Sequence, residues 1–260
     1  MTKVPKEFVD RTIESRKDSA EQNDECIILI TVDEVNDPGK LGVRDKKNPP
    51  TNTFGFGAAI VNSPDGFAMV STSYKDQKDI EKEFKAKKLD PEDRVPFADS
   101  IRKSGAETFG IYVDKTKDLP IGWDEQRGSD IMIGMIRTIL DRKILPAISS
   151  HRVTVVVDNH PGYHNKKEGN LIEAMSEPLS NAHNKEIRCR TGGKKGDEYS
   201  AHLQTTDAVA HALHRSVELN KPDMTIAMGQ KIIRLGEDDD IRRDGARGRT
   251  ESTRTSPPIL

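Results

Sequence analysis

The sequence predicts an α/β fold in which an antiparallel meander is followed by parallel strands, the whole mixed sheet being flanked by helices. Two short β-branched runs, 26–32 and 153–157, have the continuously apolar character of buried strands. Between them, residues 124–145 carry an apolar stripe with helical spacing and are followed by Pro146. A meander followed by alternating helices and strands gives a mixed sheet covered by helices.

The remaining elements follow from local patterns. A second strand is expected at 54–61, where glycines suggest close backbone approach, and the turn at 62–66 returns the chain into a third strand at 67–72. Later strands are expected at 108–113 and 187–190. Helices are expected at 75–89, 97–103, 171–179 and 202–219, with a weak helix or strand at 224–235.

These elements indicate one domain over residues 25–235, with a helical insertion at about 75–104. Residues 1–24 read as a polar N-terminal arm, and residues 236–260, rich in Asp, Arg, Gly, Ser and Thr, as a disordered tail.

Composition restricts the function classes. Charged residues make up 32% of the 260 residues, no apolar run reaches the roughly 18 residues of a membrane span, and no signal peptide is visible. Two cysteines, Cys26 and Cys189, do not make a disulfide framework, so a reducing cytoplasm is expected. Because the formal net charge is −2, a nucleic-acid surface must be a local basic patch.

Three aspartates have positions suited to a shared site. Asp33 ends the first strand, Asp158 ends the fifth, and Asp207 lies in the first turns of the last long helix. Ligands gather at the carboxyl ends of strands in α/β sheets, and clustered carboxylates suit Mg²⁺ or Mn²⁺. The alternative is that each aspartate is a turn or cap residue. Glu34 is a weaker candidate because its side chain should point to the opposite face.

Histidines form a second candidate group. His160 and His164 follow Asp158, and His211 and His214 share a helix face with Asp207. We expect His160 to act as a proton shuttle or phosphate contact, and prefer a solvated role for His214.

Basic side chains between the fifth strand and the last helix could form a phosphate-binding rim, although a solvated loop is the commoner explanation. The candidate nucleic-acid contacts are Lys115, Lys166, Lys167, Arg190, Lys194 and Lys195.

An ordered set of short motifs resembles the family known as domain of unknown function 3800, a group with a ribonuclease H-like fold. The matching pieces are Val32-Asp33-Glu34, residues 54–61, Tyr112-Val113-Asp114-Lys115, Val155 to Asp158, and Leu203-Gln204-Thr205-Thr206-Asp207-Ala208. Two positions depart from the family pattern: Val35-Asn36 replaces a Ser-Gly pair, and Thr206 replaces an alanine. The resemblance implies a ribonuclease H-like fold with Asp33, Asp158 and Asp207 as the acidic site.

Three functions are therefore open. The leading hypothesis is a metal-dependent nuclease or phosphodiester hydrolase that acts on DNA or RNA, with Mg²⁺ or Mn²⁺ on the three aspartates. The second is a non-catalytic nucleic-acid-binding or ribonucleoprotein module. This hypothesis is favoured if neither Asp197 nor Glu198 completes a set of four acidic groups. The third is a small-molecule hydrolase with a transition metal on His160, His164 and His211, which requires those side chains to converge.

Overall fold

The computed structural model describes residues 28–35, 51–117, 119–123, 126, 128–165, 168–193 and 197–242. Six strands form one mixed sheet in the order β7-β4-β1-β2-β3-β8. The strands are β1 (Ile28–Val35), β2 (Thr53–Val61), β3 (Glu107–Asp114), β4 (Arg152–Asp158), β7 (Glu186–Gly192) and β8 (Lys231–Leu235). β1, β2 and β3 are an antiparallel meander, and β4, β7 and β8 join in parallel. The predicted α/β architecture, a mixed sheet of an antiparallel meander and parallel strands flanked by helices, is confirmed.

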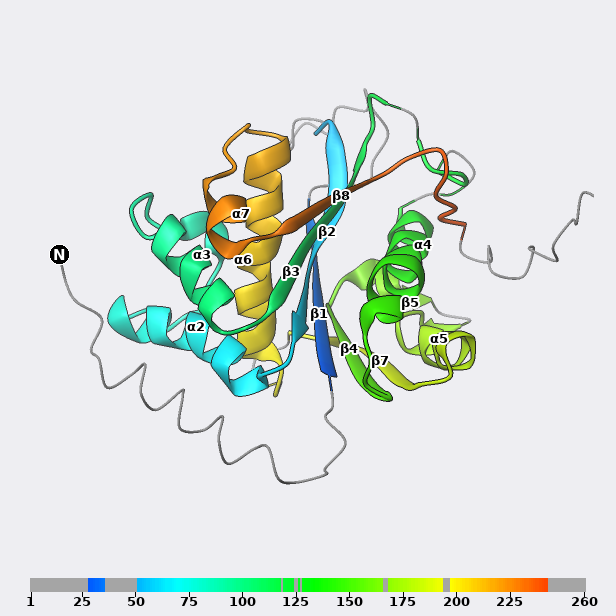
Figure 1. Cartoon of the computed structure of the whole chain (residues 1–260), viewed down its shortest axis with the longest axis horizontal. Coiled ribbons are helices and arrows are strands. Elements are labelled where there is room, and N and C mark those ends of the chain that lie inside the picture. The colour runs from blue at the N-terminus through cyan, green and yellow to red at the C-terminus, as the bar shows by residue number, and fades with distance from the viewer. Residues whose placement is uncertain are drawn as a thin grey trace, which may run out of the picture.

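Helices cover both faces of this sheet (Figure 1). One face carries α2 (Pro64–Gln77), α3 (Arg94–Lys103), α6 (Ser200–Val217) and α7 (Asp223–Met228). The other carries α4 (Ser129–Thr138), continued by a π turn at Ile139–Ile144, and α5 (Ser176–His183). Each layer encloses its own apolar core, so the sheet is buried on both faces. Short 3-10 turns lie at Ala86–Lys88, Leu145–Ala147, Pro161–Tyr163 and Glu173–Met175, and β5 (His164–Asn165) pairs with β6 (Gly169–Asn170).

The predicted strand at 67–72 is wrong, because this segment lies within α2. Pro64 occupies the start of the helix and Asp65 its first turn, positions that favour helix initiation. Phe67 and Ser71, four residues apart, are the buried positions, which is a helical period. The third strand of the meander is therefore β3. The helix predicted at 75–89 is also wrong in extent: α2 ends at Gln77, and the chain then runs irregularly to the turn at Ala86–Lys88.

At the carboxyl end, the weak element expected at 224–235 resolves into both α7 and β8. Residues 236–242, expected to be disordered, instead pack on the domain: Asp240 bridges to Ile121, and Ile241 is fully buried. Because Ile241 lies in a strongly charged stretch, the sequence pattern did not indicate that this segment would pack on the domain. The N-terminal arm, Cys26 and residues 243–260 lie outside the described residues. In the described part of the chain, no helix is both long enough and apolar enough to cross a bilayer.

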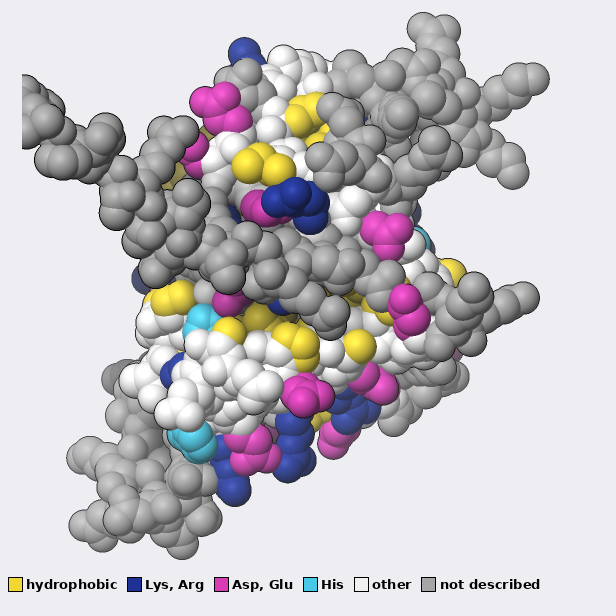
Figure 2. All heavy atoms as spheres, turned by 90° about the vertical axis from the view of Figure 1, so that its right-hand side faces the viewer, with side chains coloured by type: hydrophobic (Ala, Val, Ile, Leu, Met, Phe, Trp, Pro, Cys, Tyr) yellow, Lys and Arg dark blue, Asp and Glu magenta, His cyan; other side chains and the backbone are white. Residues whose placement is uncertain are grey.

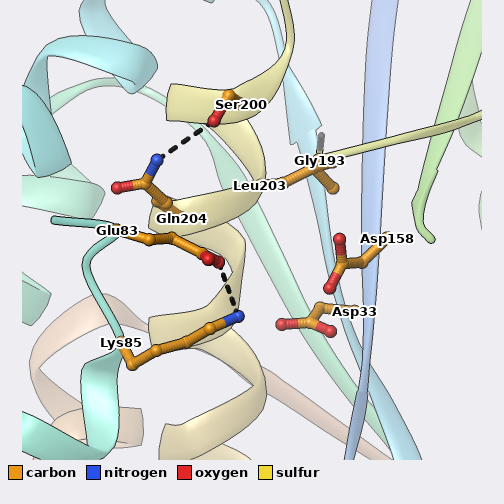
Figure 3. A pocket seen from close by; sticks show the side chains of 8 residues that line it. All are labelled: Asp33, Glu83, Lys85, Asp158, Gly193, Ser200, Leu203 and Gln204. Carbon is orange, nitrogen blue, oxygen red and sulfur yellow. Dashed lines mark hydrogen bonds and ion pairs between the residues drawn. The ribbon is translucent and has the colours of Figure 1, made fainter. Parts of the chain in front are cut away.

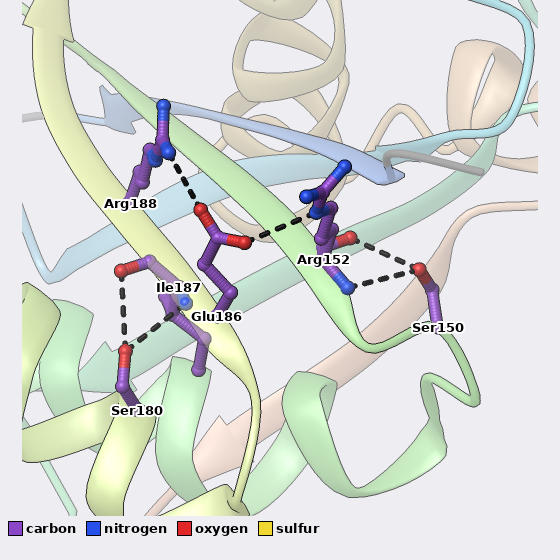
Figure 4. A network of polar contacts seen from close by, with 6 residues as sticks. All are labelled: Ser150, Arg152, Ser180, Glu186, Ile187 and Arg188. Atoms are coloured by element: carbon purple, nitrogen blue, oxygen red, sulfur yellow. Dashed lines mark hydrogen bonds and ion pairs between the residues drawn. The ribbon is translucent and has the colours of Figure 1, made fainter. Parts of the chain in front are cut away.

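Charged side chains protect the outer edge of the sheet at β7 (Figure 4). Glu186 accepts hydrogen bonds from Arg152 (3.0 Å) and Arg188 (2.6 Å), while the Ser180 hydroxyl bonds both the N–H and the carbonyl of Ile187. Charges at an edge strand disfavour pairing with another chain.

The close approach of α6 to β2 generates a first prediction. A side chain at Gly57 would overlap the backbone of Ala210 in α6, which cannot move without displacing the helix. We expect Gly57→Ala to lower the free energy of unfolding by about 1–3 kcal/mol, as overpacking does. Urea unfolding followed by circular dichroism would measure it.

Gly66→Ala is the matched control, because its new methyl group would meet only the movable Ser63 side chain, within a helix that favours alanine. Equal urea midpoints for wild type and Gly57→Ala would contradict the close packing described here.

Candidate active site

Asp33 and Asp158 lie side by side at the carboxyl ends of two parallel strands. Val32 in β1 is in register with Val157 in β4, and each aspartate is the next residue. Strand alternation points both side chains to the face that α6 covers, because Leu29 and Val156, at equivalent positions, belong to the core on that side. Only 6% of the Asp33 surface is exposed. The neighbouring positions expected from the sequence are thus observed.

Asp207 approaches the same point from α6. The hydroxyl of Thr206 donates to the carbonyl of His202 (2.9 Å) and lies 2.7 Å from the hydroxyl of Thr31 in β1, so the helix is fixed against that strand. The following residue, Asp207, is consequently held above β1. One of its oxygens accepts a hydrogen bond from the N–H of Ala86 at 2.5 Å.

The three carboxylates interact electrostatically. Burial raises the pKa of Asp33 well above its usual range, and the charges of Asp158 and Asp207 raise it further. Burial is also the main reason that the pKa values of Asp158 and Asp207 are raised. The structure therefore brings together the three aspartates that the sequence singled out.

A segment of the insertion closes this site and was missed by sequence reasoning (Figure 3). Glu83 and Lys85 line the small space in front of Asp33 and Asp158, and their side chains form an ion pair at 2.8 Å. Burial opposes the charge of Lys85, but Glu83, Asp207 and Asp158 outweigh it and raise the pKa of its ammonium. The available signal was Phe84, an apolar residue isolated in a charged run.

The donor set suits a divalent metal ion by its chemistry but not by its present geometry. Three carboxylates have the chemistry that Mg²⁺ and Mn²⁺ prefer. However, within the described ranges no three His, Cys, Asp or Glu side chains are placed to hold a metal ion in this conformation. The space in front of Asp33 and Asp158 has room for little more than a water-sized group. The donors fit a divalent ion, whereas their present arrangement with Lys85 does not.

His160 lies beside Tyr163 and Glu34 on the side of the sheet that α4 covers. Its Nδ1 accepts the N–H of Gly162 at 3.0 Å, and its ring lies 5.5 Å from that of Tyr163. Tyr163 donates to Glu34 (3.2 Å), whose side chain has the expected opposite orientation to Asp33. The hydrogen-bond and ring contacts of His160 are with Gly162 and Tyr163 and not with the three aspartates, so its predicted catalytic role stays a prediction.

The other histidines do not converge with His160. His164 contacts Asn159 (3.4 Å), whereas the ring of His211 stacks on His214 with centroids 6.3 Å apart. Burial, with the charge of His214 adding to it, lowers the pKa of His211 to about 4. The convergence of His160, His164 and His211 that the transition-metal hypothesis requires is not observed among the described residues.

The predicted basic contacts are dispersed or lie outside the described residues. Lys115 is buried just beyond β3, which β2 separates from β1, and its N–H donates to the carbonyl of Asn52. Arg190 pairs with Glu198 (2.8 Å) and Asp197 (3.5 Å) and lies over the ring of Tyr199. The two candidate fourth acids are thus engaged with Arg190.

On the face shown in Figure 2, the Lys and Arg side chains of the described residues are interspersed with those of Asp and Glu. Lys166, Lys167, Lys194 and Lys195 lie outside the described residues.

Comparison with known proteins leaves the family unassigned. No protein-family model matches the chain, and no curated protein matches it. Among solved structures, a chain from the complex of PCNA and RNase HII of Archaeoglobus fulgidus is similar to 74% of this chain and 75% of its own length. The two are 15% identical, with a TM-score of 0.45. The fold class accordingly rests on the strand order of this chain.

The burial of Asp33 generates a second prediction. We expect Asp33→Asn to raise the free energy of unfolding at neutral pH by about 0.5–2 kcal/mol, the usual size of a stabilising substitution. An amide keeps an oxygen for the N–H of Glu34 and removes one of several repelling charges.

The stability difference between Asp33→Asn and the wild type should grow as pH rises. The pKa of Asp33 is raised in the folded state, so the wild type loses stability as pH rises from its unfolded-state value, about 3.9, to its higher folded value. Urea unfolding at pH 4 and pH 7.5 should therefore show a larger difference at pH 7.5. Exposed Glu81→Gln is the control. A variant that is less stable than wild type at pH 7.5 would refute this electrostatic account.

Proposed function

We propose that the chain is a metal-dependent nuclease, or a related phosphodiester hydrolase, with Asp33, Asp158 and Asp207 as its carboxylate site. One observation supports it: strand ends of β1 and β4 and helix α6 direct three acidic side chains to one buried point. Gathering carboxylates out of water is unfavourable unless a cation neutralises them, and strongly perturbed groups cluster at functional sites.

Backbone N–H groups around the site hold one oxygen of each carboxylate. One oxygen of Asp33 accepts from the N–H of Glu34 (2.8 Å), and one of Asp158 from the N–H of Asn159 (3.0 Å). Asp207 is held in the same manner by Ala86. Asp33 and Asp158 would hold Mg²⁺ or Mn²⁺, with Asp207 reaching it from the helix. A bound divalent ion supplies a water of lowered pKa and neutralises charge on the phosphate.

A polyanionic substrate requires positive charge around the site. Lys85, with 39% of its side chain exposed, lines the entrance to the site and supplies a positive charge there. We propose that DNA or RNA is the substrate, and that Lys115, Arg190 and the lysines at 166, 167, 194 and 195 contribute to its binding. Membership of the domain of unknown function 3800 family, suggested by the motifs, remains part of this proposal.

A non-catalytic nucleic-acid-binding module is the second candidate, and one observation favours it. Lys85 already places a positive charge among the carboxylates, while Asp197 and Glu198 pair with Arg190. On this interpretation, the aspartates and Lys85 form a structural charge cluster.

The function is tested by cleavage of end-labelled single-stranded and duplex DNA and RNA in the presence of Mn²⁺, Mg²⁺ or EDTA. We expect metal-dependent cutting that Asp158→Asn reduces by at least about 100-fold, the usual effect of removing a key electrostatic group. Asp99→Asn, on the exposed surface of α3, is the matched control and should cut normally.

A folded wild type that binds these nucleic acids without cutting any of them would favour the non-catalytic module. Cutting that persists undiminished in Asp158→Asn would place the active site elsewhere.

A further inference from the structure

The strongest unassigned feature is the segment Glu83–Ala86, called the strap below, which crosses the mouth of the carboxylate site (Figure 3). We propose that the strap is a gate on this site, and that Lys85 is its resident cation, which a divalent metal ion must displace. The inference rests on the proposed metal-dependent function and adds a means of regulating it.

The strap is fastened to α6 at two points. The N–H of Phe84 donates to the side-chain oxygen of Gln204 (3.0 Å), and Gln204 in turn donates to the hydroxyl of Ser200 (3.1 Å). The N–H of Ala86 donates to Asp207. The second fastening uses a carboxylate of the proposed metal site. Metal binding at Asp207 and closure of the strap would therefore involve the same carboxylate group.

The aromatic ring of Phe84 anchors the strap to the helices below it. Phe84 is 2% exposed, and its ring centroid lies 5.2 Å from that of Phe97 in α3 and 5.4 Å from that of Tyr74 in α2. This packing holds the strap in place while leaving the charged residues on either side of Phe84 outside the core.

Lys85 and Glu83 flank the buried Phe84 and are themselves partly exposed. Their side chains are 39% and 57% exposed, and they pair with each other at 2.8 Å. An ammonium in this position satisfies part of the negative charge of Asp158 and Asp207. An outward rotation of the ion pair would remove that positive charge and open the carboxylates to a metal ion.

Competition between Lys85 and metal is tested by calorimetric titration of the full chain with Mn²⁺ alone. We expect Lys85→Gln to tighten Mn²⁺ binding at least about fivefold, the lower range of coupling between two ligands at one site. Without metal, the same variant should melt at a lower temperature than wild type, and saturating Mn²⁺ should restore it. Lys87→Gln, an exposed lysine two residues along, should behave as wild type in both measurements.

Lys85→Arg keeps the charge and should bind Mn²⁺ with affinity close to that of wild type, which separates a charge effect from misfolding. Mn²⁺ affinity that is unchanged or weaker in Lys85→Gln, or absent from both proteins, would overturn the gate. The cleavage assay distinguishes the two proposals. Tighter Mn²⁺ binding without cutting by any variant would retain the gate and reject the nuclease, whereas cutting with unchanged affinity would do the reverse.

Discussion

The parallel pairing of β1 with β4 forces two carboxylates together, and the rest of the site depends on this constraint. With Val32 opposite Val157, Asp33 and Asp158 necessarily emerge as neighbours on one face of the sheet. Helix α6 then covers them, so their charges lose water and the pKa of Asp33 rises. Burying two neighbouring carboxylates is energetically unfavourable unless a cation compensates their charge. The strap, with Lys85 at its centre, supplies one in the described conformation.

The position of Asp207 is a consequence of packing, because α6 lies unusually close to the sheet. Gly57 has no side chain where Ala210 crosses it, and Thr206 lies within hydrogen-bonding distance of Thr31 in β1. From the outer side, Ser71 in α2 donates to the carbonyl of Ala201 (2.9 Å), and Thr205 donates to that of Phe67 (3.1 Å). These contacts fix the helix both along and across the sheet. Packing of α6 on the apolar core therefore holds Asp207, the third carboxylate, in a fixed position. The burial of the carboxylates themselves is expected to reduce stability.

Sequence patterns predicted the sheet core and the neighbouring positions of Asp33 and Asp158 because both are encoded locally. The runs at β1 and β4 are β-branched, and an aspartate at a strand end can point only to one face or the other. The segment at 67–72 failed because a short apolar run suits a strand or a buried helix equally well, and tertiary packing on α6 decided between them. Lys85 was beyond prediction for a different reason. Its importance comes from Phe84 docking between α2 and α3, a contact between segments that no local pattern connects.

The charge balance around Lys85 argues against a purely structural cluster. One ammonium interacts with the carboxylates of Glu83, Asp158 and Asp207 and lines the same pocket as Asp33, and it forms an ion pair with Glu83, which lies outside the aspartate group. A salt bridge built for stability would match charges and satisfy each oxygen, as buried pairs must to offset their desolvation. Here a single charge is shared among several acids, and burial with the charges of Asp158 and Asp207 keeps the pKa of Asp33 raised. On the proposed function, this excess of negative charge would attract a second, more highly charged cation. That residual attraction is what a divalent ion would use to compete with Lys85, and it links the chemistry proposed for the aspartates to the gate proposed for the strap.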